Sequence, residues 1–145
     1  PEQGNLGVGE DMALDLERIM LLLQKRLNGM QEMKRLTGEL LESASRNDQV
    51  SLELILQMRA DEMARIEAAG EQIWLMAEQG PEEAGQVRWL MSQEFLRTGE
   101  PKGFEERKIL EIRSKTASLL KEVREADQRL NQHVGGRRSY YASNK

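Results

Sequence analysis

The sequence contains no cysteine, and its single histidine is His133. Without cysteine the chain cannot form a disulfide, present a thiolate nucleophile or bind a metal through sulfur. A di-metal carboxylate bundle uses two Glu-x-x-His motifs, whereas this chain has one histidine and Leu130 stands three residues before it. Zinc sites that use two or three histidines fail on the same shortage. The sequence therefore predicts a protein that is not an enzyme and has no cofactor or metal site.

Aromatic residues make up only 4% of the chain, and no apolar run approaches the roughly 20 residues that span a bilayer. Residues 1–5 lack the basic and apolar regions of a secretory signal. With 21 basic and 25 acidic residues the net charge is -4, which gives no general attraction to nucleic acid. We therefore expect a cytoplasmic protein that neither inserts into a membrane nor binds nucleic acid.

Helix-forming residues at heptad spacing dominate the chain, and they predict an all-α fold. The expected fold is an elongated antiparallel helical bundle of three long helices plus one shorter helix. The long helices are predicted at residues 11–45, 49–79 and 104–134, and the shorter one at residues 81–97. The domain would be residues 11–134, with a flexible arm at 1–10 and a flexible tail at 135–145. The seam of the last helix consists of Ile109, Ile112, Thr116, Leu119, Val123, Ala126, Leu130 and His133.

Turn residues separate these helices. Asn47 suits a left-handed helix end, and Asp48 suits the cap of the next helix. The pair Gly80-Pro81 stops one helix and starts another, while residues 98–103 and Gly135-Gly136 are further breaks. The first turn is short, so the first two helices should form an antiparallel hairpin.

Several single residues carry expectations about packing. Gly29 and Gly38 lie inside the first helix and suggest close approach of a neighbouring helix or a gentle bend. Arg26 interrupts the apolar seam, so its stem should lie along the core while its guanidinium reaches water. Trp74 and Trp89 are predicted to be buried, as are most of the eight methionines, including Met58 and Met63.

The helix lengths favour a binding function. A shorter helix at 81–97 would cover only part of the apolar surface that the three long helices present. The groove left uncovered would suit an amphipathic helix from another protein. A second interpretation is a structural coiled-coil homo-oligomer or interaction scaffold, in which the same stripe pairs with its own copy.

Residues 40–66 resemble the central part of the FlgN-type flagellar export chaperones. In that family a long helix ends at a short turn that carries aspartate, and a second helix follows with leucines and a basic residue. Asn47-Asp48 takes the turn here and Arg59 the basic place, while Leu52, Leu54 and Leu56 take the apolar places. Residues 126–132 are similar to the Asn/Gln-rich stretch near the end of the family's last helix. FliT-type chaperones would look much the same.

The resemblance implies a cytoplasmic chaperone for type III export during flagellum assembly. It would bind an amphipathic helical segment of a secreted hook-filament junction protein and deliver that client to an export-gate component. In such a family the last helix and the tail carry these contacts. Here they correspond to Leu119, Leu120, Val123, Leu130, Val134, Tyr140 and Tyr141.

Overall fold

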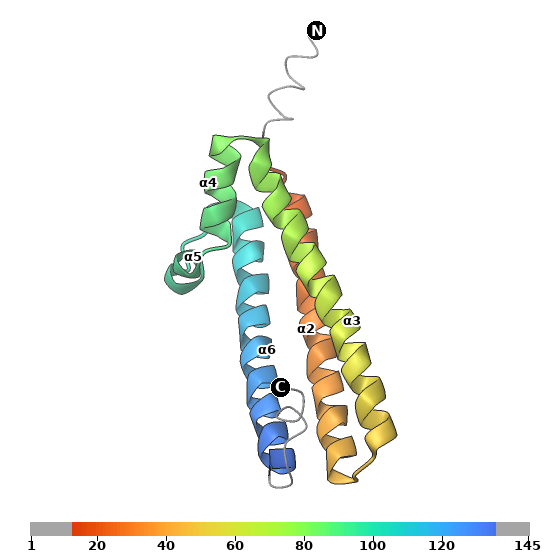
Figure 1. Ribbon diagram of the computed structural model, residues 1–145. Helices are drawn as coiled ribbons and strands as arrows, with labels where there is room; N and C mark the ends of the chain where they lie inside the picture. Colours follow the sequence, from red (N-terminus) through yellow and green to blue (C-terminus); the bar gives the residue numbers. More distant parts are fainter. Residues whose placement is uncertain (1–12, 136–145) are drawn as a thin grey trace. The chain divides into compact units, whose positions relative to one another are not determined.

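The computed structural model describes residues 13–135 of the chain and the side chains of residues 13–133. Helices and turns account for this part of the chain, which contains no strand. The predicted all-α class is therefore confirmed. Three long helices are present: α2 (Leu16–Ser45), α3 (Gln49–Met76) and α6 (Gly103–Gly135), as Figure 1 shows. The predicted arm and nearly all of the predicted tail lie outside the described residues.

The turn between α2 and α3 follows the predicted chemistry. Asn47 has a φ of 56°, in the left-handed region. The Oδ1 atom of Asp48 accepts a hydrogen bond from the Ser51 backbone N–H at 3.1 Å, and its Oδ2 atom accepts from the Ser51 hydroxyl at 2.7 Å. Asp48 thereby caps the N-terminus of α3, because it satisfies an amide that has no partner inside the helix.

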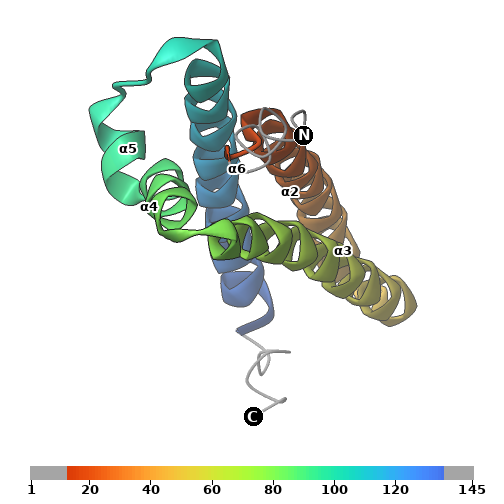
Figure 2. The ribbon, with the colours of Figure 1, turned by 90° about the horizontal axis from the view of Figure 1, so that it is seen from above.

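The segment after α3 differs from the prediction of one helix over residues 81–97. It consists of the 3₁₀ helix η1 (Ala77–Gln79), α4 (Pro81–Leu90) and α5 (Gln93–Thr98). The break occurs because the Ser92 hydroxyl accepts the Phe95 N–H at 3.0 Å and starts a new helix. Figure 2 shows α4 and α5 in succession beside α6.

The chain divides into two compact units. Unit 1 consists of the residues up to Leu27 and of Glu67–Lys115, and it includes α4 and α5. Unit 2 consists of Asn28–Ile66 and the residues from Thr116 onward. Each of the three long helices is divided between the units, with one segment in unit 1 and the other in unit 2.

Unit 1 has one hydrophobic core, centred on the fully buried ring of Phe95. The Arg113 guanidinium on α6 holds the turn after α4, because its Nη1 donates to the carbonyl oxygens of Leu90 at 2.8 Å and Ser92 at 2.6 Å. The buried residues of this core are Ile19, Leu22, Leu23, Ala69, Ile73, Met76, Val87, Leu90, Phe95 and Ile109.

Unit 2 has two smaller core clusters, and both use α6. Val123 packs with Met30 and Met33, whereas Leu130 packs further along with Leu36, Leu40, Ala44 and Ile55. Because higher numbers on α6 meet higher numbers on α2, these two segments run parallel within unit 2. The tight turn at residues 46–48 makes α3 antiparallel to α2.

The two glycines of α2 have different surroundings. A Cβ atom added at Gly29 would lie 2.5 Å from the Cγ1 atom of Ile66, so glycine is needed for the close approach of α3. A Cβ atom at Gly38 would meet nothing within 4 Å. Close approach is therefore confirmed at Gly29, and it does not explain Gly38.

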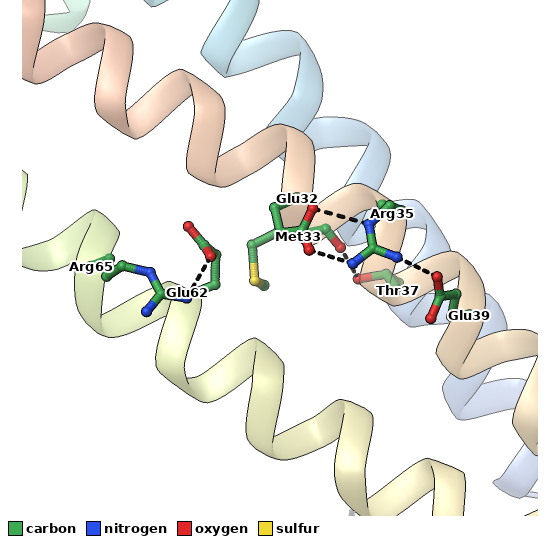
Figure 3. Close-up of polar contacts among 7 residues, drawn as sticks. All are labelled: Glu32, Met33, Arg35, Thr37, Glu39, Glu62 and Arg65. Atoms are coloured by element: carbon green, nitrogen blue, oxygen red, sulfur yellow. Dashed lines mark hydrogen bonds and ion pairs between the residues drawn. The ribbon is translucent and has the colours of Figure 1, made fainter.

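The outer surface of α2 in unit 2 carries ion pairs. Figure 3 shows Arg35 between Glu32 and Glu39, with hydrogen bonds to both carboxylates. The hydrogen bond to Glu32 raises the pKa of Arg35 and lowers that of Glu32. Exposed pairs of this kind contribute little to stability, so they do not decide the fold.

Candidate protein interaction surface

The predicted contact residues of α6 differ in how deeply their side chains are buried. Val123 and Leu130 are buried in the chain's own core clusters, and Leu119 packs against the cluster of Val123. Leu120 is partly exposed. The expectation that Val123 and Leu130 form an open surface is therefore not met, because helices α2 and α3 of unit 2 already cover them. The side chains of Val134, Tyr140 and Tyr141 lie outside the described residues.

Besides Leu120 on α6, which is 37% exposed, the large exposed apolar residues described in unit 2 lie on α3. Val50 is 80% exposed and Leu54 is 62% exposed, and Met58 follows four residues later and is also exposed. Residues four apart lie on the same ridge of a helix. We call Val50, Leu54 and Met58 the α3 outer stripe. The prediction that Met58 and Met63 are buried is wrong, since both are exposed.

A polar ridge lies beside the α3 outer stripe, one residue earlier at each step. Its amides and acids are linked in pairs: Gln49 Nε2 donates to Glu53 at 3.2 Å, and Gln57 Nε2 donates to Asp61 at 3.0 Å. Glutamine is neutral, so these bonds leave both negative charges in place. The α3 outer stripe is thus an apolar ridge with an acidic edge.

Unit 1 carries a small surface groove near the start of α2. Arg18 on α2 donates from Nη2 to the Gln72 amide oxygen at 2.9 Å, across the groove. Its volume is about 410 Å³, and its lining consists of Arg18, Gln72, Leu75, Met76 and Gln79. Trp74 and Trp89 are exposed, so the prediction that both tryptophans are buried is wrong. The Trp89 ring still contacts the Phe95 ring, with centroids 5.5 Å apart.

One buried ion pair lies in unit 2 and was not predicted. Arg59 on α3 binds Asp127 on α6 through two hydrogen bonds, of 3.0 and 3.1 Å. The side chain of Arg59 is only 11% exposed and that of Asp127 is 32% exposed. This two-point geometry satisfies a largely buried guanidinium. Sequence analysis could not find the pair, because its members are 68 residues apart.

Two arginines in unit 1 have no such carboxylate. Arg26 on α2 is half-buried, and its Nε is the one buried side-chain nitrogen or oxygen in the described part of the chain that lacks a hydrogen-bond partner. Burial lowers the pKa of Arg26. The pKa of Arg113 is lowered too, mainly by burial and to a smaller extent by the positive charge of Arg26. The Arg26 guanidinium was expected to reach water, and the structure shows that its Nε atom is enclosed.

The described side chains do not form a cluster that could bind a metal ion. Across residues 13–133 no three histidine, aspartate or glutamate residues lie close enough together to hold a metal ion. None of the helices that the structure describes is long and apolar enough to cross a membrane. His133 contacts the end of α2, with its Nε2 3.2 Å from the Ala44 carbonyl oxygen, and a carbonyl can only accept that bond.

Comparison of the chain with protein-family models, with characterised proteins and with solved structures finds no significant match. The candidate site therefore stands on its own geometry.

Proposed function

We propose that this protein binds an amphipathic helix of another protein along the α3 outer stripe. The observation that carries the proposal is the exposure of Val50 and Leu54 on a helix whose opposite face is already packed in unit 2. Burying apolar side chains contributes roughly 25 cal/mol for each Å² removed from water, so a partner's apolar face would gain by docking here. Two helices can pack with the i, i+4 ridge of one in the groove between side-chain rows of the other.

The small number of helices in unit 2 supports the same binding surface. α4 and α5 belong to unit 1, so unit 2 is formed by segments of only three helices in the described part of the chain. The expectation that a short third helix leaves a groove open stays a prediction. The apolar residues on which the present proposal rests lie on α3 rather than on α6.

The acidic edge specifies the chemistry of the partner. Glu53 and Asp61 lie beside the stripe and accept hydrogen bonds from neutral glutamines. A bound helix would therefore carry lysine or arginine on the flank that faces this edge, next to its apolar face. Charge complementarity of this kind gives specificity and speeds association more than it adds affinity.

The resemblance to FlgN-type chaperones supplies the proposed biological role. In that role the protein acts in the cytoplasm and holds the terminal helical segment of a hook-filament junction protein before export. The exposed stripe would be covered by the client during this step, which keeps both apolar surfaces from aggregating. Delivery to an export-gate component belongs to the same proposal.

Two leucines with the same exposure provide a matched test. Leu54 on α3 is 62% exposed and Leu21 on α2 is 63% exposed, so an aspartate at either position should leave the fold intact. The probe is a labelled helical segment from the end of a hook-filament junction protein, titrated with the full chain in a fluorescence anisotropy assay. We expect Leu54→Asp to weaken binding at least about tenfold and Leu21→Asp to leave it nearly unchanged.

Three results would contradict the proposal. Equal binding by all three proteins would place the contact elsewhere, and an effect of Leu120→Asp alone would return it to α6. A concentration-dependent dimer in analytical ultracentrifugation that Leu54→Asp dissolves would show that a second copy covers the stripe. The protein would then be a homo-oligomeric scaffold.

A further inference from the structure

The methionines of α3 in unit 2 differ in exposure from those of the core. Met30 and Met33 on α2 are buried in a core cluster, and Met76 at the end of α3 is buried in the core of unit 1. Met58 is 38% exposed and Met63 is 47% exposed. Two side chains that carry an oxidisable sulfur are therefore accessible from solvent, and Met58 belongs to the α3 outer stripe.

A thioether reacts with a hydroperoxide without help from a catalytic group. The sulfur attacks one oxygen of the peroxide, so that a sulfur–oxygen bond forms and the oxygen–oxygen bond breaks. Methionine is oxidised by two electrons to the sulfoxide. Hydrogen peroxide is reduced, and its second oxygen leaves with both protons as water. The product is a polar side chain in place of an apolar one, and access of the oxidant to the sulfur controls the rate.

The surroundings of Met58 make this change damaging to an apolar contact. A sulfoxide oxygen is a hydrogen-bond acceptor. Asp61 on the neighbouring polar ridge is an acceptor too, and the Gln57 Nε2 already donates to it at 3.0 Å. An apolar helix face docked over an oxidised Met58 would therefore take a polar oxygen out of water without offering it a donor.

We propose that oxidation of Met58 by an uncharged hydroperoxide prevents binding of the client to the α3 outer stripe, and that a bound client protects Met58 from oxidation. The acidic edge repels anionic oxidants, whereas it does not oppose an uncharged one. This inference rests on the proposed function, because it requires a client on the stripe.

Met63 provides a matched control on the same helix. Five residues rotate an α-helix by about 140°, so Met63 is exposed but lies off the stripe. We expect hydrogen peroxide to oxidise Met58 and Met63 at least about tenfold faster than Met30 and Met33. An excess of a methionine-free client segment should slow the oxidation of Met58 and leave that of Met63 unchanged. Peptide mapping by mass spectrometry measures each residue in the full chain.

Binding of the labelled client segment is measured by fluorescence anisotropy after catalase has removed the peroxide. Oxidised Met63→Leu, which retains Met58, should bind at least about tenfold more weakly than the same variant before oxidation. Met58→Leu keeps an apolar side chain of similar volume, so it should bind equally well before and after peroxide treatment. Circular dichroism should show the same helical content in all four samples.

The inference is overturned if Met58 reacts no faster than Met30, if the client segment does not protect it, or if oxidised and untreated Met63→Leu bind equally well. A loss of helical content in oxidised Met63→Leu would also overturn it, because weaker binding would then come from unfolding. The proposed function survives each of these results as long as Leu54→Asp still weakens binding of the segment. If Leu54→Asp has no effect, the client does not occupy the stripe and both proposals are wrong.

Discussion

In unit 2 the largely buried Arg59 is paired with a carboxylate. In unit 1 the half-buried Arg26 and Arg113 have no carboxylate partner among the described residues. Arg59 meets Asp127 through two hydrogen bonds, so the charge is neutralised inside the fold. Arg26 has an enclosed Nε without a partner, and its charge acts on Arg113. The first arrangement is complete in the isolated chain. The second leaves the Nε atom of Arg26 without a hydrogen-bond partner among the described residues.

Both units expose apolar side chains. These are Leu21, Trp74, Leu75, Trp89 and Phe104 in unit 1 and Val50, Leu54, Met58, Met63 and Leu120 in unit 2. The units therefore differ in how their buried charges are paired rather than in whether they expose apolar side chains.

Removing one charge from each unit should have opposite effects on stability. Asp127→Asn leaves Arg59 enclosed without its counter-charge, and we expect a loss of about 2–4 kcal/mol in the free energy of unfolding. Arg26→Met removes an uncompensated charge and keeps the packing, so stability in chloride should be unchanged or rise by about 1 kcal/mol. Urea unfolding at neutral pH measures both.

The proposed difference in charge pairing between the units is contradicted if Arg26→Met destabilises the protein as much as Asp127→Asn does. Arg26 would then have a stabilising partner in the folded chain. The double change Arg59→Met, Asp127→Leu is the control, because replacing the whole pair with apolar groups should cost much less than breaking it.

Acid should weaken the N-terminal cap of α3 in unit 2 and leave that of α5 in unit 1 unchanged. The effect on stability should be smaller than that of removing a buried charge. Hydrogen bonds from the Ser51 side chain and backbone lower the pKa of Asp48 below its usual value of 3.8. A carboxylate with a lowered folded-state pKa stabilises above its unfolded pKa, and this contribution disappears as the pH falls through the folded value. In unit 1, α5 is capped by Ser92, which does not titrate in this range.

We therefore expect hydrogen-exchange protection at the start of α3 to fall in acid, while protection at the start of α5 stays nearly constant. The variant Asp48→Asn retains an acceptor for capping without a titrating group, so it should lose the pH dependence of α3. Equal acid sensitivity of the two helix starts in the unmodified protein would contradict this assignment.

Periodicity and turn residues predicted much of the fold. The end of α2 and the starts of α3 and α6 lie at or next to the expected residues, because heptad spacing and the residues Asn47 and Asp48 act locally. The first helix was expected from residue 11, but α2 begins at Leu16, where the Asp15 carboxylate accepts the Arg18 N–H. The close approach at Gly29 also followed from the cost of glycine within a helix. The break at Ser92 was missed because serine is compatible with both a helix interior and a cap.

The candidate site was harder to predict. Apolar residues lie on several sides of α3, so the sequence does not indicate which side packs, and Met58 and Trp74 were assigned to the wrong one. Val123 and Leu130 are apolar seam residues, and a seam can meet a partner or the chain's own helices equally well. The Arg59–Asp127 pair and the unpaired Arg26 depend on contacts between distant segments, which spacing along one helix does not reveal.

The most direct test of the charge deficit places a carboxylate beside Arg26 and measures the coupling in a double-mutant cycle. Gly70→Asp and Gly70→Asn are compared by urea unfolding, each with Arg26 intact and with Arg26→Met. We expect aspartate to stabilise the protein by about 1 kcal/mol more than asparagine when Arg26 is present, and this advantage to vanish in the Arg26→Met background. The same difference between aspartate and asparagine in both backgrounds would show that Arg26 does not lack a counter-charge.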